Sequence, residues 1–376
     1  MRILVMMSSI PLRGAERNIV NVLPYMRDAG ADVFLGTLNT RRDGPLAEVF
    51  ARTGIERLDL GARRMLDPAA WRRFGALLQD YRVDLIHAQD QDTILYAAAA
   101  HWRHRMPTVM TRHVLFEPAP TWRKWVRARL VLLAARRGFD RIVAVSEAVR
   151  RDFSARAGVP LARIQTIYNG LDMERFLAEY DRQAIRARLG WPQDAPVILL
   201  IAALDAGKGH DVLFEALPAI QAAVPEVRVM LVGQGKLVEE IQAQAAAFGP
   251  AVTLMGQRTD VPELLAACDV VVQTSWAEAL PTVLIEAGAS ARPVVATDVG
   301  GSAEIVADGE SGYIVPPGDA KAVAERVVQL LRDAALARRM GQTARAIVLR
   351  RFSLARQAEE TLALYEDVLR GRGSLS

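Results

Sequence analysis

Short apolar runs alternate with segments of helical periodicity along the whole chain, and this alternation constrains the fold more than any other feature. Apolar runs of about four to eight residues between helices are typical of parallel strands covered on both faces. A chain of 376 residues is too long for one core, because cores stop growing at roughly 250–300 residues. We therefore expect an α/β protein with two doubly wound parallel sheets that face each other across a cleft.

Twelve strands are predicted, six in each half of the chain. They fall at 2–7, 33–37, 83–88, 107–111, 141–145, 165–168, 197–202, 227–232, 252–255, 270–273, 293–297 and 313–315. The turn-prone Gly190-Trp191-Pro192 lies inside a charged stretch between the halves, which indicates a linker. We expect an N-terminal domain over 1–175, the linker and second domain over 176–352, and a last helix within 353–376 that crosses back to the first domain.

Composition excludes several classes of protein. Hydrophobic residues make up 51% and charged residues 24%, the balance of a folded globular chain. The longest apolar stretch, 195–204, has ten residues, half of what a membrane helix needs, and the N-terminus is typical of a buried first strand rather than a signal peptide. The single Cys268 forms no internal disulfide, so a cytoplasmic location is expected.

Charge is unevenly distributed between the halves. Residues 1–175 carry 28 basic and 18 acidic side chains, whereas residues 176–376 carry 19 and 25. A basic half suits a phosphorylated substrate, an anionic membrane or nucleic acid. Zinc-finger spacing, an RNP-like aromatic motif and a basic tail are all missing from the sequence, so nucleic acid is not an expected partner.

The strongest local motif is SWAEALPTVLIEAGASARPVVATDVGG, residues 275–301. Glu278 lies in the loop after an apolar strand, Pro281 stands where a helix begins, and Glu286 falls one turn inside it. The backbone amides of Thr282, Val283 and Leu284 are expected to be unpaired at that helix start, where they suit a diphosphate. The alternative is a helix whose two glutamates are only solvated.

Other loops after predicted strands carry weaker signals for anion binding. Gly14 and Ala15 precede a helix expected to begin near Glu16, so backbone amides there suit an anion, although a loop glycine is usually only a turn. Lys208 stands in a loop of small residues, where an ammonium can reach phosphate, and Gly233-Gln234-Gly235 allows close approach of a ligand. A solvated surface lysine is the ordinary alternative.

His113 is the best histidine candidate, because it follows a strand in the loop Thr111-Arg112-His113. His87 ends a strand, and His210 is expected near a helix start. Asp90 and Asp92 form a D-x-D pair of the kind that chelates Mg²⁺ or Mn²⁺ in some sugar-nucleotide enzymes. They follow a first-half strand, far in sequence from the phosphate signals, so no metal site and no cofactor are expected.

In order along the chain, these motifs resemble those of the retaining glycosyltransferases of family 4, which have the GT-B fold of two Rossmann-like domains. The matching segments are Gly14-Ala15-Glu16-Arg17, Val145-Ser146, Tyr168-Asn169-Gly170-Leu171-Asp172, Lys208-Gly209-His210, Glu278 with Glu286, Pro293-Val294-Val295-Ala296-Thr297 and Val299-Gly300-Gly301. The resemblance spans nearly the whole chain. The ordered set is specific, while each piece by itself is not.

The resemblance implies a metal-independent retaining transferase that moves a sugar from a nucleotide-diphosphate sugar, a UDP-sugar first, to a saccharide or lipid-linked saccharide in cell-envelope or exopolysaccharide synthesis. Glu278 and His113 would act at the transferred sugar, Glu286 at the ribose, and Lys208 at the diphosphate. The loop of Arg258 would meet the base. Backbone from Ala279 through Leu280, Pro281 and Thr282 to Val283 would hold the sugar and phosphate.

The chain departs from the family pattern at two positions. Ala203 stands where members often have the arginine of Gly-Arg-Leu, and Arg13 replaces the first glycine of a Gly-Gly-Ala-Glu loop. Two alternatives therefore stay open, a GT-B-fold sugar-nucleotide epimerase and a noncatalytic sugar-nucleotide-binding subunit. The basic, apolar segment 122–137 further predicts contact with the inner face of an anionic membrane, or else a core helix with arginines on its wet face.

Overall fold

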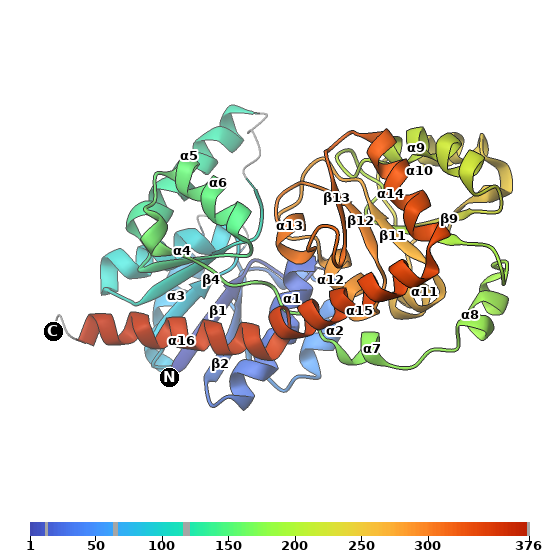
Figure 1. Cartoon of the computed structure of the whole chain (residues 1–376). Helices are drawn as coiled ribbons and strands as arrows, with labels where there is room; N and C mark the ends of the chain where they lie inside the picture. Colours follow the sequence, from blue (N-terminus) through green and yellow to red (C-terminus); the bar gives the residue numbers. More distant parts are fainter. Residues whose placement is uncertain (12–13, 63–66, 116–120, 374–376) are drawn as a thin grey trace. The chain divides into compact units, whose positions relative to one another are not determined.

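The computed structural model describes residues 1–11, 14–62, 67–115 and 121–373, and its contacts divide the chain into two units (Figure 1). Unit 1 comprises Met1–Gly170 together with Leu354–Ser376, and unit 2 comprises Leu171–Ser353. Each unit is a parallel sheet flanked by helices. The expected α/β fold with two doubly wound sheets is confirmed.

Unit 1 contains a seven-stranded sheet in the order β3-β2-β1-β4-β5-β6-β7, and every neighbouring pair is parallel. Its strands are β1 (Arg2–Met7), β2 (Asp32–Thr37), β3 (Arg57–Asp59), β4 (Leu85–Ala88), β5 (Thr108–Arg112), β6 (Arg141–Ala144) and β7 (Ile164–Thr166). Its helices are α1 (Gly14–Asp28), α2 (Leu46–Ala51), α3 (Pro68–Asp80), α4 (Gln91–His104), α5 (Trp122–Arg137), α6 (Glu147–Ala157) and α16 (Leu354–Gly373). Residues 3–7 of β1 are buried because helices cover both faces of the sheet.

Unit 2 contains a six-stranded sheet in the order β10-β9-β8-β11-β12-β13, also parallel throughout. Its strands are β8 (Val197–Ile201), β9 (Arg228–Val232), β10 (Val252–Leu254), β11 (Val270–Gln273), β12 (Val294–Thr297) and β13 (Gly312–Val315). Its helices are α7 (Glu174–Leu177), α8 (Arg182–Leu189), α9 (His210–Ala223), α10 (Val238–Ala246), α11 (Val261–Ala267), α12 (Thr282–Ala289), α13 (Ser302–Ile305), α14 (Ala320–Arg332) and α15 (Ala334–Arg351).

All twelve predicted strands are present, with ends shifted by at most two residues. The sequence missed β3, because this edge strand has only three residues and buries only its middle one, Leu58. The helix expected near Glu16 begins at Gly14, and the last helix begins at Leu354. None of the helices in the described part of the chain combines the length and apolar character that a bilayer span requires.

Helix α16 packs against α1 within unit 1 (Figure 1). Its buried residues recur at helical spacing and join the core of that unit. They include Leu354, Ala358, Leu362, Tyr365 and Val368. One apolar stripe thus attaches the C-terminal helix to the first sheet.

Each sheet has one place where the winding of the chain reverses. The reversal lies between β1 and β4 in unit 1 and between β8 and β11 in unit 2. In open parallel sheets, ligands bind beside the carboxyl ends of the two strands at this point. The loops after these four strands are therefore the places to search for a site.

Candidate functional site

In unit 2 the reversal point brings Lys208 and Glu278 together. Lys208 follows β8 and Glu278 follows β11, and Lys208 Nζ lies 2.7 Å from Glu278 Oε1. Ser275 Oγ donates to the same carboxylate oxygen at 2.7 Å. The exposed fractions of the two charged side chains are 29% and 15%, so the pair is partly shielded from water yet open to a ligand.

Hydrogen bonds join the loops that carry this pair. The Trp276 amide donates to Gly207 O at 2.8 Å, and Thr274 Oγ1 donates to Gly209 O at 2.7 Å. On the other side, Thr297 Oγ1 donates to Ser275 O at 2.6 Å. Consecutive strand ends thus hold the Glu278 loop in place, which is what a preorganised site requires.

Gly300 is required for the close approach of a neighbouring loop. Its φ is +53°, and a Cβ placed there would lie 1.6 Å from the carbonyl oxygen of Glu278. The Gly301 amide donates to Ala279 O at 3.1 Å, just beyond this crossing. Only glycine therefore lets the loop after β12 pass directly over the backbone of Glu278.

Helix α12 presents one accessible face, formed by Thr282, Val283 and Glu286, while the rest of the helix is buried. The prediction of three unpaired amides is wrong for Leu284, whose N–H donates to Pro281 O at 3.1 Å because the first turn tightens. In the described part of the chain, the amides of Thr282 and Val283 have no backbone acceptor. Two amides therefore point out of the helix start beside the Glu278 loop.

The remaining predicted donor-site residues of unit 2 differ in accessibility and in their partners. Leu280 is buried and Ala279 half-buried. Arg258 forms a two-point contact with Asp260, from Nε at 2.9 Å and Nη2 at 2.6 Å. This bond raises the pKa of Arg258 and lowers that of Asp260. The charge of Arg258 is thus already balanced within its own loop.

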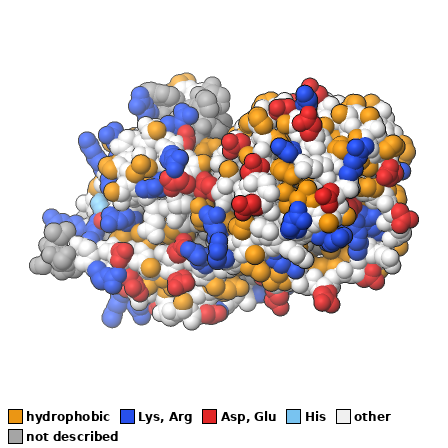
Figure 2. Space-filling model, in the orientation of Figure 1, with side chains coloured by type: hydrophobic (Ala, Val, Ile, Leu, Met, Phe, Trp, Pro, Cys, Tyr) orange, Lys and Arg blue, Asp and Glu red, His pale blue; other side chains and the backbone are white. Residues whose placement is uncertain are grey.

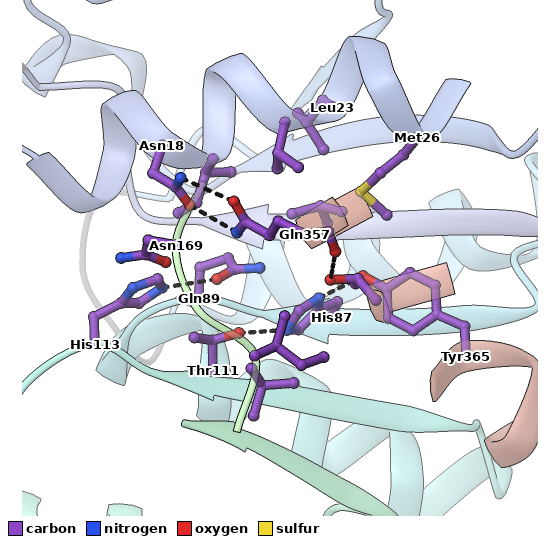
Figure 3. Close-up of a pocket in the computed structure, with 16 residues that line it drawn as sticks. Asn18, Leu23, Met26, His87, Gln89, Thr111, His113, Asn169, Gln357 and Tyr365 are labelled. Carbon is purple, nitrogen blue, oxygen red and sulfur yellow. Dashed lines mark hydrogen bonds between the residues drawn. The ribbon is translucent and has the colours of Figure 1, made fainter. Parts of the chain in front are cut away.

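In unit 1, His113 lies beside a small cavity of about 30 Å³ that polar and apolar side chains line together (Figure 3). Its Nε2 is 2.9 Å from Gln89 Oε1, and its Nδ1 is buried with no hydrogen-bond partner in the described structure. Burial, and to a lesser extent the charge of Arg112, lowers the pKa of His113 to about 4. The imidazole is therefore neutral near pH 7 and offers Nδ1 as an acceptor.

A second imidazole, His87, lies deeper in the same cavity (Figure 3). It is paired at both ring nitrogens, with Tyr365 Oη at 2.5 Å and Thr111 Oγ1 at 2.7 Å. Burial lowers the pKa of His87 to about 3. His87 therefore connects α16 to the sheet and serves packing rather than ligand contact.

The other unit 1 candidates are placed as follows. Gly14 and Ala15 form the first residues of α1, and Arg13 lies outside the described residues. Asp90 caps α4 and accepts Ser8 Oγ at 2.8 Å, while Asp92 pairs with Arg127 at 2.6 Å. Within the described ranges, no group of three acidic, His or Cys side chains gathers as a metal site would.

Sequence reasoning missed Ser275, Gln89 and Trp276. Ser275 precedes Glu278 by three residues, a spacing that signals a turn, whereas Gln89 carried no local signal for contact with His113. Trp276 is 47% exposed, and its ring occupies the space a Cβ of Gly318 would need. An exposed aromatic side chain beside polar groups is a common feature of sugar-binding surfaces because it offers a flat apolar face.

Two family models match the chain, and together they span most of it. "Glycosyl transferases group 1" matches residues 181–347, and "Glycosyltransferase Family 4" matches residues 12–175. The first lies within unit 2, and the second within unit 1 apart from its last five residues.

Two curated relatives that the chain resembles are also named as sugar-transferring enzymes. A D-inositol 3-phosphate glycosyltransferase of Streptomyces bingchenggensis is 28% identical over 314 residues, which is 77% of this chain and 67% of the relative. A GDP-mannose-dependent alpha-(1-6)-phosphatidylinositol monomannoside mannosyltransferase of Mycolicibacterium smegmatis is 33% identical over 236 residues. That alignment covers 60% of this chain and 61% of the relative, less than two thirds of its length.

Among solved structures, Anabaena HepE in complex with UDP-glucose is similar over nearly the whole chain. The TM-score is 0.82 at 28% identity, with 96% of this chain and 99% of that chain covered. HepE in complex with UDP and glucose gives a TM-score of 0.84 at 26% identity, with 98% and 100% covered.

Proposed function

The chain belongs to the GT-B glycosyltransferases of family 4, and from this premise we propose that unit 2 binds a nucleotide-diphosphate sugar and that the enzyme transfers its sugar with retention of configuration. The observation that carries the proposal is the Lys208–Glu278 pair at the reversal point of the second sheet. A UDP-sugar is the first donor to test, since HepE was solved with UDP-glucose.

The proposal gives each charged group a place along the donor. Lys208 and the amides of Thr282 and Val283 face the diphosphate, where an ammonium and a helix start stabilise negative charge. Glu286, on the accessible face of α12, binds ribose hydroxyls. Glu278 orients the transferred sugar, and Arg258 places its loop near the base.

The reaction follows from these positions. The bond between the anomeric carbon and the diphosphate oxygen breaks, and its electron pair stays on the diphosphate beside Lys208. The acceptor oxygen bonds to the same face of the anomeric carbon, and the departing phosphate oxygen accepts its proton. For His113 we propose the role that the family resemblance implies, which is to act at the transferred sugar. No step calls for a metal, so EDTA should leave turnover unchanged.

Two variants test the assignment of residues. Glu278→Gln should lower kcat by about 100-fold, the scale of losing one electrostatic group at the reaction centre, while donor affinity changes little. Lys208→Ala should weaken binding of the donor but not of the free nucleoside, because its proposed partner is phosphate. Nucleotide release and calorimetry measure the two effects.

The matched control is the surface pair Lys321 and Glu325, which is exposed and 3.9 Å apart in the same unit. Lys321→Ala and Glu325→Gln should leave both quantities unchanged. If Glu278→Gln keeps wild-type turnover, the role of Glu278 is wrong. Epimerised donor in place of a glycosylated acceptor would identify the epimerase alternative, and binding without turnover would identify a noncatalytic subunit.

For the acceptor we propose a saccharide or lipid-linked saccharide, reached at an anionic membrane surface on the inner, cytoplasmic side. The support is an exposed apolar stripe along α5, whose members recur every three or four residues. They are Trp122, Val126, Leu130 and Leu133. The opposite side of the helix buries Val131, Ala134 and Ala135, so α5 is both a core helix and an amphipathic surface helix. The side chains of residues 123–125 lie outside the described part.

Vesicle co-sedimentation tests the membrane proposal. The wild type should bind anionic vesicles at low salt, and the double variant Leu130→Ser/Leu133→Ser should lose most of this binding. Val49→Ser/Leu161→Ser removes two equally exposed apolar residues elsewhere in unit 1 and should bind normally. Wild-type protein that stays in the supernatant would refute the membrane contact and leave the transferase proposal intact.

A further inference from the structure

A second cavity of about 380 Å³ lies in unit 2 at the amino ends of β8, β11 and β12. It is therefore at the opposite edge of the sheet from Lys208 and Glu278. Its lining includes four arginines and two acidic residues, together with an apolar wall from α14 and α15. The charged residues are Arg182, Arg186, Arg292, Arg338, Asp194 and Asp269. Figure 2 shows basic side chains gathered on the face over α11 and α15.

Both carboxylate oxygens of Asp269 already accept hydrogen bonds from neighbouring groups. Its Oδ1 accepts Arg182 Nη2 at 2.6 Å, and its Oδ2 accepts Arg186 Nη2 and the Val197 amide, both at 2.8 Å. The carboxylate therefore hydrogen-bonds both arginines of α8, whose two positive charges exceed its single negative charge, and it forms no bond with the other two arginines.

The guanidinium of Arg186 is likewise occupied, because it donates hydrogen bonds to backbone carbonyls. Its Nε donates to Ala267 O, and its Nη1 donates to the carbonyls of Pro192, Gln193 and Ala195. The side chain is only 2% exposed, so it closes the floor of the cavity and holds the linker to the sheet. It offers no donor to a ligand.

Arg292 and Arg338 still have guanidinium N–H groups available to donate hydrogen bonds. Arg292 Nη1 makes one long bond to Cys268 O at 3.2 Å, and its Nε is buried with no partner in the described structure. Burial lowers the pKa of Arg292, so its charge is held in the cavity at a cost. The Arg338 guanidinium has no hydrogen-bond or ion-pair partner among the described residues.

The residue just before Arg292 has a strained backbone conformation. Ala291 has φ +52°, a left-handed conformation that is unfavourable for a residue with a Cβ. The turn fits closely against α15, since a Cβ at Gly341 would lie 2.1 Å from Ala291 O. The turn and α15 are thus fitted together at the cavity that Arg292 and Arg338 both line.

We propose that this cavity binds a small phosphorylated compound, whose phosphate accepts hydrogen bonds from Arg292 and Arg338 and from the remaining donors of Arg182. A phosphate carries up to two negative charges and three acceptor oxygens, which matches the guanidinium donors left over by Asp269. The volume suits a compound of sugar-phosphate size, because ligand cavities begin at roughly 300 Å³. The site is independent of the proposed donor site.

Calorimetric titration with inorganic pyrophosphate tests the proposal on the full chain. The wild type should bind saturably, and Arg338→Gln should weaken the affinity at least about tenfold, the loss of one charge-assisted contact. Arg338→Lys should recover part of it, because lysine keeps the charge but not the planar fork. Arg339→Gln removes an exposed arginine next in the same helix that does not line the cavity, and should bind as the wild type does.

Lys208→Ala separates the two sites. Pyrophosphate binding that survives Lys208→Ala and is lost in Arg338→Gln supports the proposal. Binding lost only in Lys208→Ala would place the probe in the donor site and overturn it. The proposal also fails if wild-type titration does not saturate, if Arg338→Gln binds normally, or if malonate binds as tightly as pyrophosphate at equal ionic strength.

Discussion

Replacing Tyr365 by Phe should destabilise unit 1 by about 1–3 kcal/mol, the cost of leaving a buried polar group unpaired. The hydroxyl of Tyr365 lies 2.5 Å from Nδ1 of His87, and both residues are almost completely buried. The variant leaves that nitrogen without a protein partner at a buried position, where His87 is only 4% exposed to solvent.

Tyr81→Phe is the matched control, because it also removes a hydroxyl bond of 2.5 Å, here to Glu56 at an exposed position. Water can replace that bond, so the control should cost far less than Tyr365→Phe. Urea denaturation gives the global free energy of unfolding, and hydrogen exchange of α16 amides gives the local opening free energy. If the two variants lose equal stability, burial of the stranded nitrogen does not set the cost, and the reasoning is refuted.

Two further predictions concern pH and backbone fit. The free energy of unfolding should fall as pH decreases below about 6.5, because His87 and His113 have folded pKa values of about 3 and about 4, so the unfolded chain binds protons that the folded chain does not. By pH 5 the loss should reach about 2 kcal/mol for each imidazole, and His87→Gln should flatten the slope seen in urea titrations at several pH values. Gly300→Ala should abolish turnover because its Cβ would meet Glu278 O at 1.6 Å, whereas Gly309→Ala, with φ +75° and open space around it, should cost only stability. Wild-type turnover in Gly300→Ala would contradict the close crossing of the two loops.

The sequence by itself determined the fold class and the positions of nearly all strands. Buried parallel strands are apolar along their whole length, so 270–273 and 293–297 stand out without any tertiary information. The loops after those strands could be identified as candidate sites for the same reason, because parallel strands end at one edge of a sheet. Edge strand β3 was not predicted, because three residues with one buried side chain carry no periodic signal.

Contacts between residues distant in sequence were decided only by the tertiary structure. Lys208 and Glu278 are brought within 2.7 Å by the order of β8 and β11, and Arg186 reaches Asp269 through the same sheet. Only the fold gathers four arginines of the second half around one cavity. Periodicity reports which face of an element is buried, whereas strand order and side-chain packing decide which polar groups meet, and no local pattern contains that information.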